Sequence, residues 1–250
     1  MLPGTGRSVP IHEPARIEDV FQERHPDVVF NCAAYNSVDQ AEAEPEAARE
    51  SNVIGPRVIA AACRRHGAVF VHYSTNFVFD GSLDRDYVES DEPAPLSVYG
   101  ASKLAGEAEV FSSGARALVI RTAAVYGGPH SFPRRILQRA AGNDRIQVVS
   151  DQRVNPTYAR DLAAASIELV DQGVAGIVHV AGGGCCGWDE FARAVLDEFG
   201  VNTEVEPVPS SSFPTPARRP INGCLGTARY RALRPWREAL HEWALEAKKA

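Results

Sequence analysis

Residues 68–74 have the sequence AVFVHYS, an apolar run of strand length without alternation between apolar and polar positions. Such a run is typical of a strand that is buried on both faces of a parallel sheet. Similar runs occur at residues 27–33 (DVVFNCA), 117–122 and 176–181, and helical patterns separate them. This alternation predicts an α/β fold in which helices cover both faces of a parallel sheet.

The remaining periodicities give the order of elements and indicate a second, smaller lobe. We expect helices at residues 46–66, 98–111, 133–141, 159–171, 188–199 and 236–248, and short strands at residues 146–149 and 205–208. After Gly200 the alternation stops, and a Pro- and Ser-rich stretch spans residues 207–220. We expect this part to close over the carboxyl ends of the strands, where ligands bind in open α/β sheets.

Composition excludes several classes of protein. The chain has 250 residues, of which 44% are apolar and 23% charged, as in folded proteins rather than disordered ones. The net charge of -6 and the absence of a Lys/Arg-rich block argue against a nucleic-acid-binding surface. Neither an apolar run of membrane-spanning length nor an apolar leader occurs, so we expect a cytoplasmic protein that does not bind membranes.

The cysteines and histidines show no metal-binding spacing. The five cysteines are Cys32, Cys63, Cys185, Cys186 and Cys224. The adjacent residues Cys185 and Cys186 would form a strained bridge at best. We therefore expect all five cysteines to be reduced and, because the histidines also lack paired spacing, we expect no metal site.

The most informative residues are Tyr99 and Lys103, whose i, i+4 spacing on a helix places both side chains on one face. The phenol of tyrosine has a pKa near ~10, and a neighbouring ammonium lowers that pKa by favouring the phenolate. The pair is therefore suited to exchange a proton with a carbonyl or alcohol oxygen. For this short motif alone, two solvated helix residues are an equally good interpretation.

Hydroxyl and small side chains follow two of the expected strands. Thr75 follows the strand at residues 68–74, at the sheet edge where catalytic groups gather, although Ser74 and Thr75 would also suit a cap or turn. Residues 31–35 (NCAAY) close the preceding strand, and their small side chains allow either a flat ligand or a tightly packed helix. Asn52, within an expected helix, is either a surface residue or a water-holding group.

Seven blocks of sequence occur in an order that resembles one known family. They are NCAAYNSVDQAEAEPEAARESNVIGP, VHYSTNFVFDG, PLSVYGASKLAGE, RTAAVYG, DQRVNPTYARDLA, WDEFA and FPTPARRPINGCL. In this order they resemble the dTDP-4-dehydrorhamnose reductases, a family of extended short-chain dehydrogenases/reductases. The resemblance extends over nearly the whole chain from about residue 18 onward.

The resemblance implies a Rossmann-like, doubly wound dinucleotide-binding domain at residues 1–150, to which residues 159–181 return. It implies that residues 182–250 form mainly a small lobe for the sugar nucleotide. NADPH or NADH would deliver hydride to C4 of a nucleotide-linked 4-keto-6-deoxysugar similar to dTDP-4-dehydrorhamnose. The expected partner is therefore that nucleotide sugar, with a homodimer as the candidate assembly.

The resemblance also implies roles for individual residues. Tyr99 would donate the proton, Lys103 would bind the cofactor ribose and tune the tyrosine, and Thr75 would contact the substrate keto oxygen. Cofactor contacts are implied for Ala33, Ala34, Tyr35, Asn52, Ser74, Tyr99 and Lys103. Substrate contacts are implied for Val38, Thr75, Asn76, Tyr99, Ala124, Arg218 and Asn222.

The chain departs from the family pattern at its start and in the substrate site. Residues 3–7 contain G-x-G, but no strand precedes it, so we expect an N-terminally truncated Rossmann-like sheet without the Gly-rich opening. Ala124 stands where the family has a tryptophan, which predicts a larger sugar pocket and a related 4-keto sugar as substrate. The choice between NADPH and NADH and the stereochemistry at C4 stay open.

Other functions of related proteins compete with simple reduction. Dehydratases of similar sequence carry Asp-Glu after the threonine, whereas Asn76 and Phe77 follow Thr75 here and do not titrate, which favours simple carbonyl reduction. A non-catalytic regulatory subunit would explain the missing Gly-rich opening but not the retained Tyr99 and Lys103. A sugar-nucleotide epimerase would use the same pair with tightly held NAD.

Overall fold

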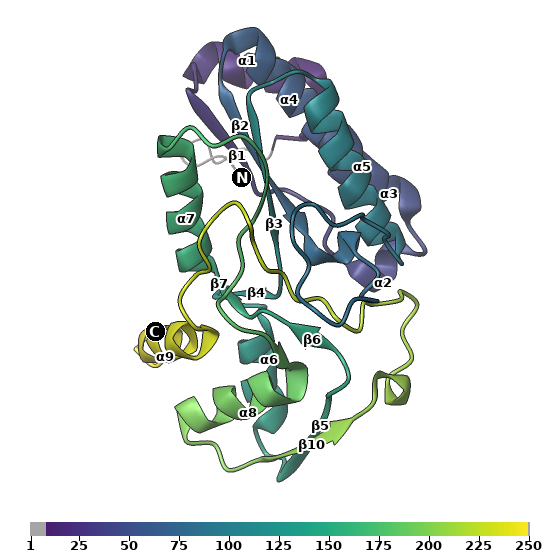
Figure 1. Cartoon of the computed structure of the whole chain (residues 1–250), viewed down its shortest axis with the longest axis vertical. Helices are drawn as coiled ribbons and strands as arrows, with labels where there is room; N and C mark the ends of the chain where they lie inside the picture. The colour runs from purple at the N-terminus through teal and green to yellow at the C-terminus, as the bar shows by residue number, and fades with distance from the viewer. Residues whose placement is uncertain (1–8, 250) are drawn as a thin grey trace.

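The computed structural model describes residues 9–249, so the G-x-G of residues 4–6 lies outside the described residues (Figure 1). At its centre is a parallel sheet of four strands in the order β1-β2-β3-β8. The strands are β1 (Val28–Asn31), β2 (Val69–Thr75), β3 (Ala117–Thr122) and β8 (Gly176–His179). The expectation of an α/β fold around a parallel sheet is confirmed.

The register of the sheet brings the carboxyl ends of its strands to one edge. Asn31 is paired with His72, and Thr75 is paired with Thr122. Because parallel strands point the same way, the side chains that follow β1, β2 and β3 gather at this edge. Thr75, a candidate catalytic residue, is the last residue of β2. It therefore lies at this edge, beside the end of β3.

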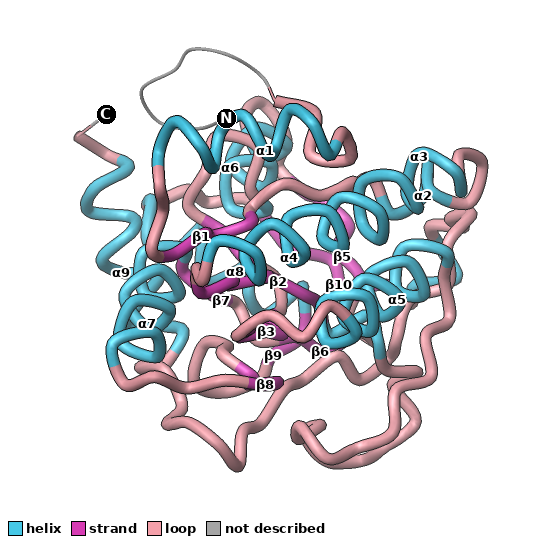
Figure 2. The backbone as a smooth tube through the Cα atoms, turned by 90° about the horizontal axis from the view of Figure 1, so that it is seen from above, coloured by secondary structure: helices cyan, strands magenta, loops and turns pink. Residues whose placement is uncertain are grey.

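Helices cover both faces of the sheet (Figure 2). One face carries α1 (Pro14–Arg24), α4 (Gly55–His66) and α5 (Val98–Ser112), and the other carries α7 (Ala159–Asp171). Phe70 and Val119 join the apolar core on the first face, whereas Leu118 and Ile120 join the core beneath α7. No helix among residues 9–249 has both the length and the apolar character needed to cross a membrane.

The helix expected at residues 46–66 is divided into three parts. α3 (Pro45–Arg49) is followed by a π-helical segment, η1 (Glu50–Ile54), and then by α4. A short helix, α2 (Val38–Ala41), precedes them. Single π turns inside helices occur often at functional sites, and this one carries the completely buried Asn52.

A second lobe is built from segments on both sides of β8 in the sequence. It contains α6 (Phe132–Ala140), β5 (Arg145–Val149), α8 (Trp188–Phe199), β10 (Glu204–Val208) and α9 (Trp236–Ala247). β5 pairs in parallel with β10, and Tyr126, Phe191 and Trp243 pack together in the aromatic core. This pairing places residues 132–149 in the second lobe, so the boundary differs from the one expected at residue 150.

Very short elements connect the two parts. β4 (Val125–Tyr126) pairs with β7 (Thr157–Tyr158), and β6 (Arg153–Val154) pairs with β9 (Cys186–Gly187). Two 3-10 turns, η2 (Asn76–Val78) and η3 (Ser210–Ser212), complete the described elements. A strand of two residues shows no periodicity, so sequence patterns did not predict these strands.

A disulfide joins Cys185 to Cys224, with 6.0 Å between their Cα atoms. The expectation that all five cysteines are reduced is therefore wrong. The partners are 39 residues apart, and their spacing in the sequence did not indicate that their loops meet. Cys32, Cys63 and Cys186 are free thiols.

Candidate active site

Side chains from two neighbouring segments hold the N-terminus of α5. Ser97 Oγ accepts a hydrogen bond from Gly100 N at 3.2 Å, and Glu42 Oε1 accepts one from Val98 N at 2.8 Å. Both bonds satisfy N–H groups that have no partner within the helix. The start of α5 is thereby fixed, and with it the position of the two candidate residues Tyr99 and Lys103.

Tyr99 lies against the end of β2. Its ring packs edge-to-face on Phe77 with 5.6 Å between the centroids, and its hydroxyl lies 3.5 Å from Asn36 Oδ1. Burial raises the pKa of Tyr99, and the Thr75 hydroxyl opposes this shift only in part. The loss of hydration has the largest effect on this pKa, and the expectation that Lys103 lowers it stays a prediction.

Lys103 is almost completely buried, and its ammonium donates a 2.6 Å hydrogen bond to the carbonyl oxygen of Tyr73. Burial lowers the pKa of Lys103 to about 8, and the charge of Glu107 counteracts part of this shift. At pH 7 most molecules therefore carry the charged ammonium. It presents N–H donors at the edge of the sheet, beside Thr75 and Tyr99.

A buried network behind Lys103 was missed by sequence reasoning. Glu107 accepts hydrogen bonds from Ser74 Oγ and from Arg121, whose Nη2 lies 2.7 Å from Glu107 Oε2. The Arg121 and Glu107 side chains are only 2% and 3% exposed. The network ties α5 to β2 and β3. Ser74, implied as a cofactor contact, therefore points toward Glu107, and nothing in the sequence spacing indicated the arginine.

Asn52 holds the backbone that follows β1. Its Oδ1 accepts a 2.8 Å hydrogen bond from Tyr35 N, and its Nδ2 donates to Tyr35 O at 3.1 Å and to Ser102 Oγ at 3.0 Å. Asn31 Oδ1 also accepts from Ala33 N at 3.1 Å. Asn52 is thus not a surface residue, and its protein partners occupy its amide. It fixes the turn on which the implied cofactor contacts lie.

A segment of the chain after β10 crosses the site, and we call residues 217–226 the strap. Gly223 O accepts a 2.9 Å hydrogen bond from Asn76 Nδ2, next to Thr75. Asn222 Nδ2 donates to two backbone carbonyls of the loop at residues 83–85, at 2.7 and 2.8 Å. The amides of Asn76 and Asn222, both implied as substrate contacts, therefore hold the strap in place.

The strap is also joined to the start of the first lobe. Arg219 forms an ion pair with Asp39 of α2 at 2.7 Å, and Ala217 N donates to Asp39 Oδ1 at 3.2 Å. The guanidinium of Arg219 lowers the pKa of Asp39. Sequence reasoning had selected the neighbours of this pair, since Val38 begins α2 and Arg218 is exposed on the strap.

Ala124 follows β3 in an unusual backbone conformation. Its φ angle is +43°, in the left-handed region that residues with a Cβ rarely adopt. The Ala124 carbonyl accepts a 3.2 Å hydrogen bond from Thr157 N, which holds this turn against β7. A bound sugar would meet only a methyl group at this half-buried position.

The carboxyl edge of the sheet fits a nicotinamide dinucleotide. Ala33 is exposed and Ala34 and Tyr35 are half-buried, so the backbone after β1 is accessible to a flat ligand. Thr122 Oγ1, at the end of β3, is buried and has no hydrogen-bond partner among the described residues. Together with the N–H donors of Lys103, these features suit a ligand that has both a flat ring and a part rich in hydroxyl groups.

Comparison with known proteins identifies the family. A family model described as the RmlD substrate binding domain matches residues 1–248. A dTDP-4-dehydrorhamnose reductase from Mycobacterium tuberculosis is 42% identical over an alignment of 253 positions, which covers 96% of this chain and 83% of the relative. The chain belongs to the dTDP-4-dehydrorhamnose reductase family. A member from Salmonella typhimurium is 37% identical over 94% of this chain and 82% of its own length.

Solved structures of the dTDP-4-dehydrorhamnose reductase family have the same fold. The Clostridium acetobutylicum protein matches with a TM-score of 0.93 and 33% identity, over 96% of this chain and 87% of its own. The Bacillus anthracis protein, solved in complex with NADP, matches with a TM-score of 0.92 and 33% identity, over 95% and 87%. These matches confirm both the resemblance and the Rossmann-like fold expected from the sequence.

Proposed function

We propose that the protein is an NADPH- or NADH-dependent reductase of the C4 keto group of a dTDP-linked 4-keto-6-deoxysugar. The observation that carries this proposal is the placement of Tyr99 and the buried Lys103 on α5, where the Tyr99 ring packs against Phe77, two residues after Thr75 at the carboxyl end of β2. Relatives named as dTDP-4-dehydrorhamnose reductases support the substrate class, and the relative with bound NADP supports the cofactor.

The residues of the site have complementary tasks in this reaction. A bound nicotinamide cofactor supplies hydride to the substrate carbonyl carbon. A tyrosine phenol is protonated at neutral pH, so Tyr99 can donate its proton to the keto oxygen. The Thr75 hydroxyl donates a hydrogen bond to the same oxygen, and the ammonium of Lys103 binds the ribose and stabilises the resulting phenolate.

The substrate lies, in this proposal, between the strand ends and the second lobe. The cofactor runs along Ala33, Ala34 and Tyr35, and the exposed guanidinium of Arg218 binds the diphosphate of the sugar nucleotide. The small side chain of Ala124 leaves room for the sugar. We further propose a cytoplasmic location. We also propose a homodimer, which sedimentation of the purified protein would test.

Tyr99→Phe tests the proton donor. We expect kcat to fall by roughly 100-fold or more, because general acid catalysis contributes about this factor, while the Kd for NADPH stays within about twofold. NADPH oxidation with dTDP-4-dehydrorhamnose and calorimetry with NADPH measure the two quantities. The matched control is Tyr230→Phe, because the Tyr230 hydroxyl contacts Glu168 at 2.8 Å, outside the site. Full turnover by the Tyr99 variant would contradict the proposed role.

The stoichiometry of the wild-type reaction separates the other two functions. A reductase consumes one NADPH for each sugar nucleotide reduced. An epimerase would convert the sugar without net consumption of NADPH. A regulatory subunit would show no turnover and would instead bind an enzyme stoichiometrically.

A further inference from the structure

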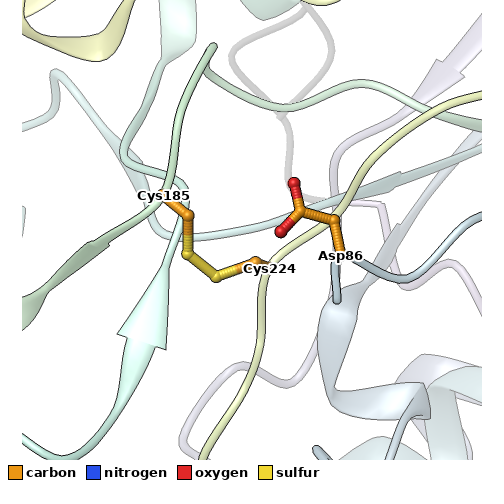
Figure 3. Close-up of side chains that lie close together, drawn as sticks. All are labelled: Asp86, Cys185 and Cys224. Atoms are coloured by element: carbon orange, nitrogen blue, oxygen red, sulfur yellow. A yellow bond between two sulfur atoms is a disulfide. The ribbon is translucent and has the colours of Figure 1, made fainter. Parts of the chain in front are cut away.

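The disulfide between Cys185 and Cys224 connects the strap to the loop between β8 and β9 (Figure 3). Cys185 lies between β8 and β9 and is half-buried, whereas Cys224 lies within the strap and is completely buried. Gly223, the residue before Cys224, accepts the hydrogen bond from Asn76 at the candidate active site. The bridge is therefore one residue from the contact that holds the strap beside Thr75.

A second link keeps the two cysteines adjacent without the bridge. Asn155 Nδ2 donates to Gly184 O at 3.0 Å, and Asn155 Oδ1 accepts from Leu225 N at 2.7 Å. Gly184 and Leu225 directly neighbour Cys185 and Cys224 in the sequence. The 6.0 Å between the Cα atoms is within the range that a disulfide requires. The thiols of the reduced protein would thus remain in position to pair again.

A cavity lies near the pair. It has a volume of about 90 Å³, and its lining includes Gly184, which precedes Cys185, and Leu225, which follows Cys224. The Asp86 carboxylate lies close to both sulfur atoms (Figure 3). Because Cys185 is the more exposed partner, a soluble thiolate would attack its sulfur atom in the oxidised protein, and in the reduced protein its thiolate would attack a soluble disulfide.

We propose that Cys185 and Cys224 are a reversible thiol–disulfide pair that locks the strap over the active site. In the oxidation step, the Cys185 thiolate attacks a small-molecule disulfide, expels one thiolate and forms a mixed disulfide. The Cys224 thiolate then displaces the second small thiol. The two cysteines lose two electrons and two protons, and the small disulfide becomes two thiols.

Locking the strap has a consequence for the substrate. The exposed Arg218, proposed to bind the diphosphate, belongs to the strap, so reduction loosens the segment that carries it. We expect the KM for the sugar nucleotide to rise severalfold on reduction, with little change in the Kd for NADPH. This consequence rests on the proposed function, whereas the thiol chemistry and the release of the strap do not.

Trypsin cleavage after Arg218 measures the release of the strap without any catalytic assay. The full chain would be equilibrated in mixtures of reduced and oxidised glutathione, alkylated and analysed by mass spectrometry, and then digested. We expect a reversible transition of the Cys185–Cys224 pair and about tenfold faster cleavage of the reduced form, since a native disulfide restrains local opening. Cys185→Ser should be cleaved at the fast rate under all conditions.

A free thiol outside the pair and the neighbouring Asp86 provide the control variants for this experiment. Cys32→Ser removes a free thiol outside the pair and should keep the redox-dependent cleavage. Equal cleavage of the oxidised and reduced forms would overturn the proposal, as would failure of the pair to form in oxidised glutathione. Stoichiometric Zn²⁺ binding by the reduced protein, lost in Asp86→Asn, would assign the group to a metal instead. If the wild-type protein showed redox-dependent cleavage but did not reduce the sugar nucleotide, only the proposed function would be contradicted.

Discussion

Lys103 carries a positive charge inside the protein, next to one backbone carbonyl and close to Glu107. Its pKa in the folded protein is about 8, compared with an ordinary value of 10.5. Between these two pH values the unfolded chain binds a proton that the folded protein does not. Stability therefore increases with pH over this range, and at pH 7 the buried charge lowers the free energy of unfolding.

Lys103→Met should consequently stabilise the protein at pH 7 while it abolishes the function of the side chain. We expect the free energy of unfolding to rise by about 1–3 kcal/mol at pH 7, and the gain to shrink as the pH approaches 10.5. Urea unfolding at pH 7 and at higher pH measures this, with Lys249→Met as the exposed control. A variant less stable than wild type at pH 7 would show that the bond to Tyr73 O outweighs burial.

Residues with local signals were the ones that sequence reasoning found. The i, i+4 spacing of Tyr99 and Lys103, and the place of Thr75 at the end of a strand, are visible within short windows. Asn52 was selected, but its buried role was not predicted, because its partners lie 17 and 50 residues away. The burial of the Tyr99 phenol, which raises its pKa, was not predicted for a related reason, since burial is a property of the folded chain.

At the scale of elements, α5 is attached to the sheet through the ion pair between Glu107 and Arg121. Arg121→Met leaves the Glu107 carboxylate buried without its charged partner, and we expect a loss of about 3–5 kcal/mol in the free energy of unfolding. Urea unfolding provides the measurement. Arg145→Met is the matched control, because its partner Glu204 is exposed and such pairs contribute less than about 1 kcal/mol.

The double variant Glu107→Gln with Arg121→Met tests the cause of that loss. Removing both charges should recover a large part of the stability, because an unpaired buried charge is the main cost. If the single Arg121 variant unfolds like wild type, the ion pair does not hold α5. If the double variant is no better than the single one, lost packing around Arg121 is the cause.

The long elements were predictable, and the short ones were not. α7 and α8 begin and end where their apolar periodicity predicted, and β3 covers the residues of its apolar run. The π turn of η1 interrupts a continuous helical pattern without a break in periodicity. The paired dipeptides of β4, β6, β7 and β9 depend entirely on contacts between distant segments.

At the scale of the whole molecule, the strap is connected to α2 by the ion pair of Asp39 and Arg219. Both side chains are partly exposed, so Arg219→Gln should change stability by less than about 1 kcal/mol. We expect instead a severalfold higher KM for the sugar nucleotide and faster trypsin cleavage after Arg218. Arg218→Gln, next to it, should raise KM without changing the exposure of the strap.

The two results separate an indirect from a direct contribution to binding. Hydrogen exchange of the backbone amides in the strap measures its exposure in both variants, including the Arg218 variant, which lacks the cleavage site. An unchanged cleavage rate in the Arg219 variant would show that the ion pair does not restrain the strap.

The boundary between the lobes differs from the predicted one because β5 pairs with β10, which lies far along the chain.

The pairing of β5 with β10 also means that β5 is synthesised well before its partner strand. Arg145 and its partner Glu204 are 59 residues apart. At roughly 5–20 residues per second, β5 leaves the exit tunnel roughly 3–12 s before the strand that covers its edge. During this interval the nascent chain exposes the alternating apolar side chains of Ile146 and Val148. We therefore expect chaperones to bind this protein during its synthesis more than after the chain is complete.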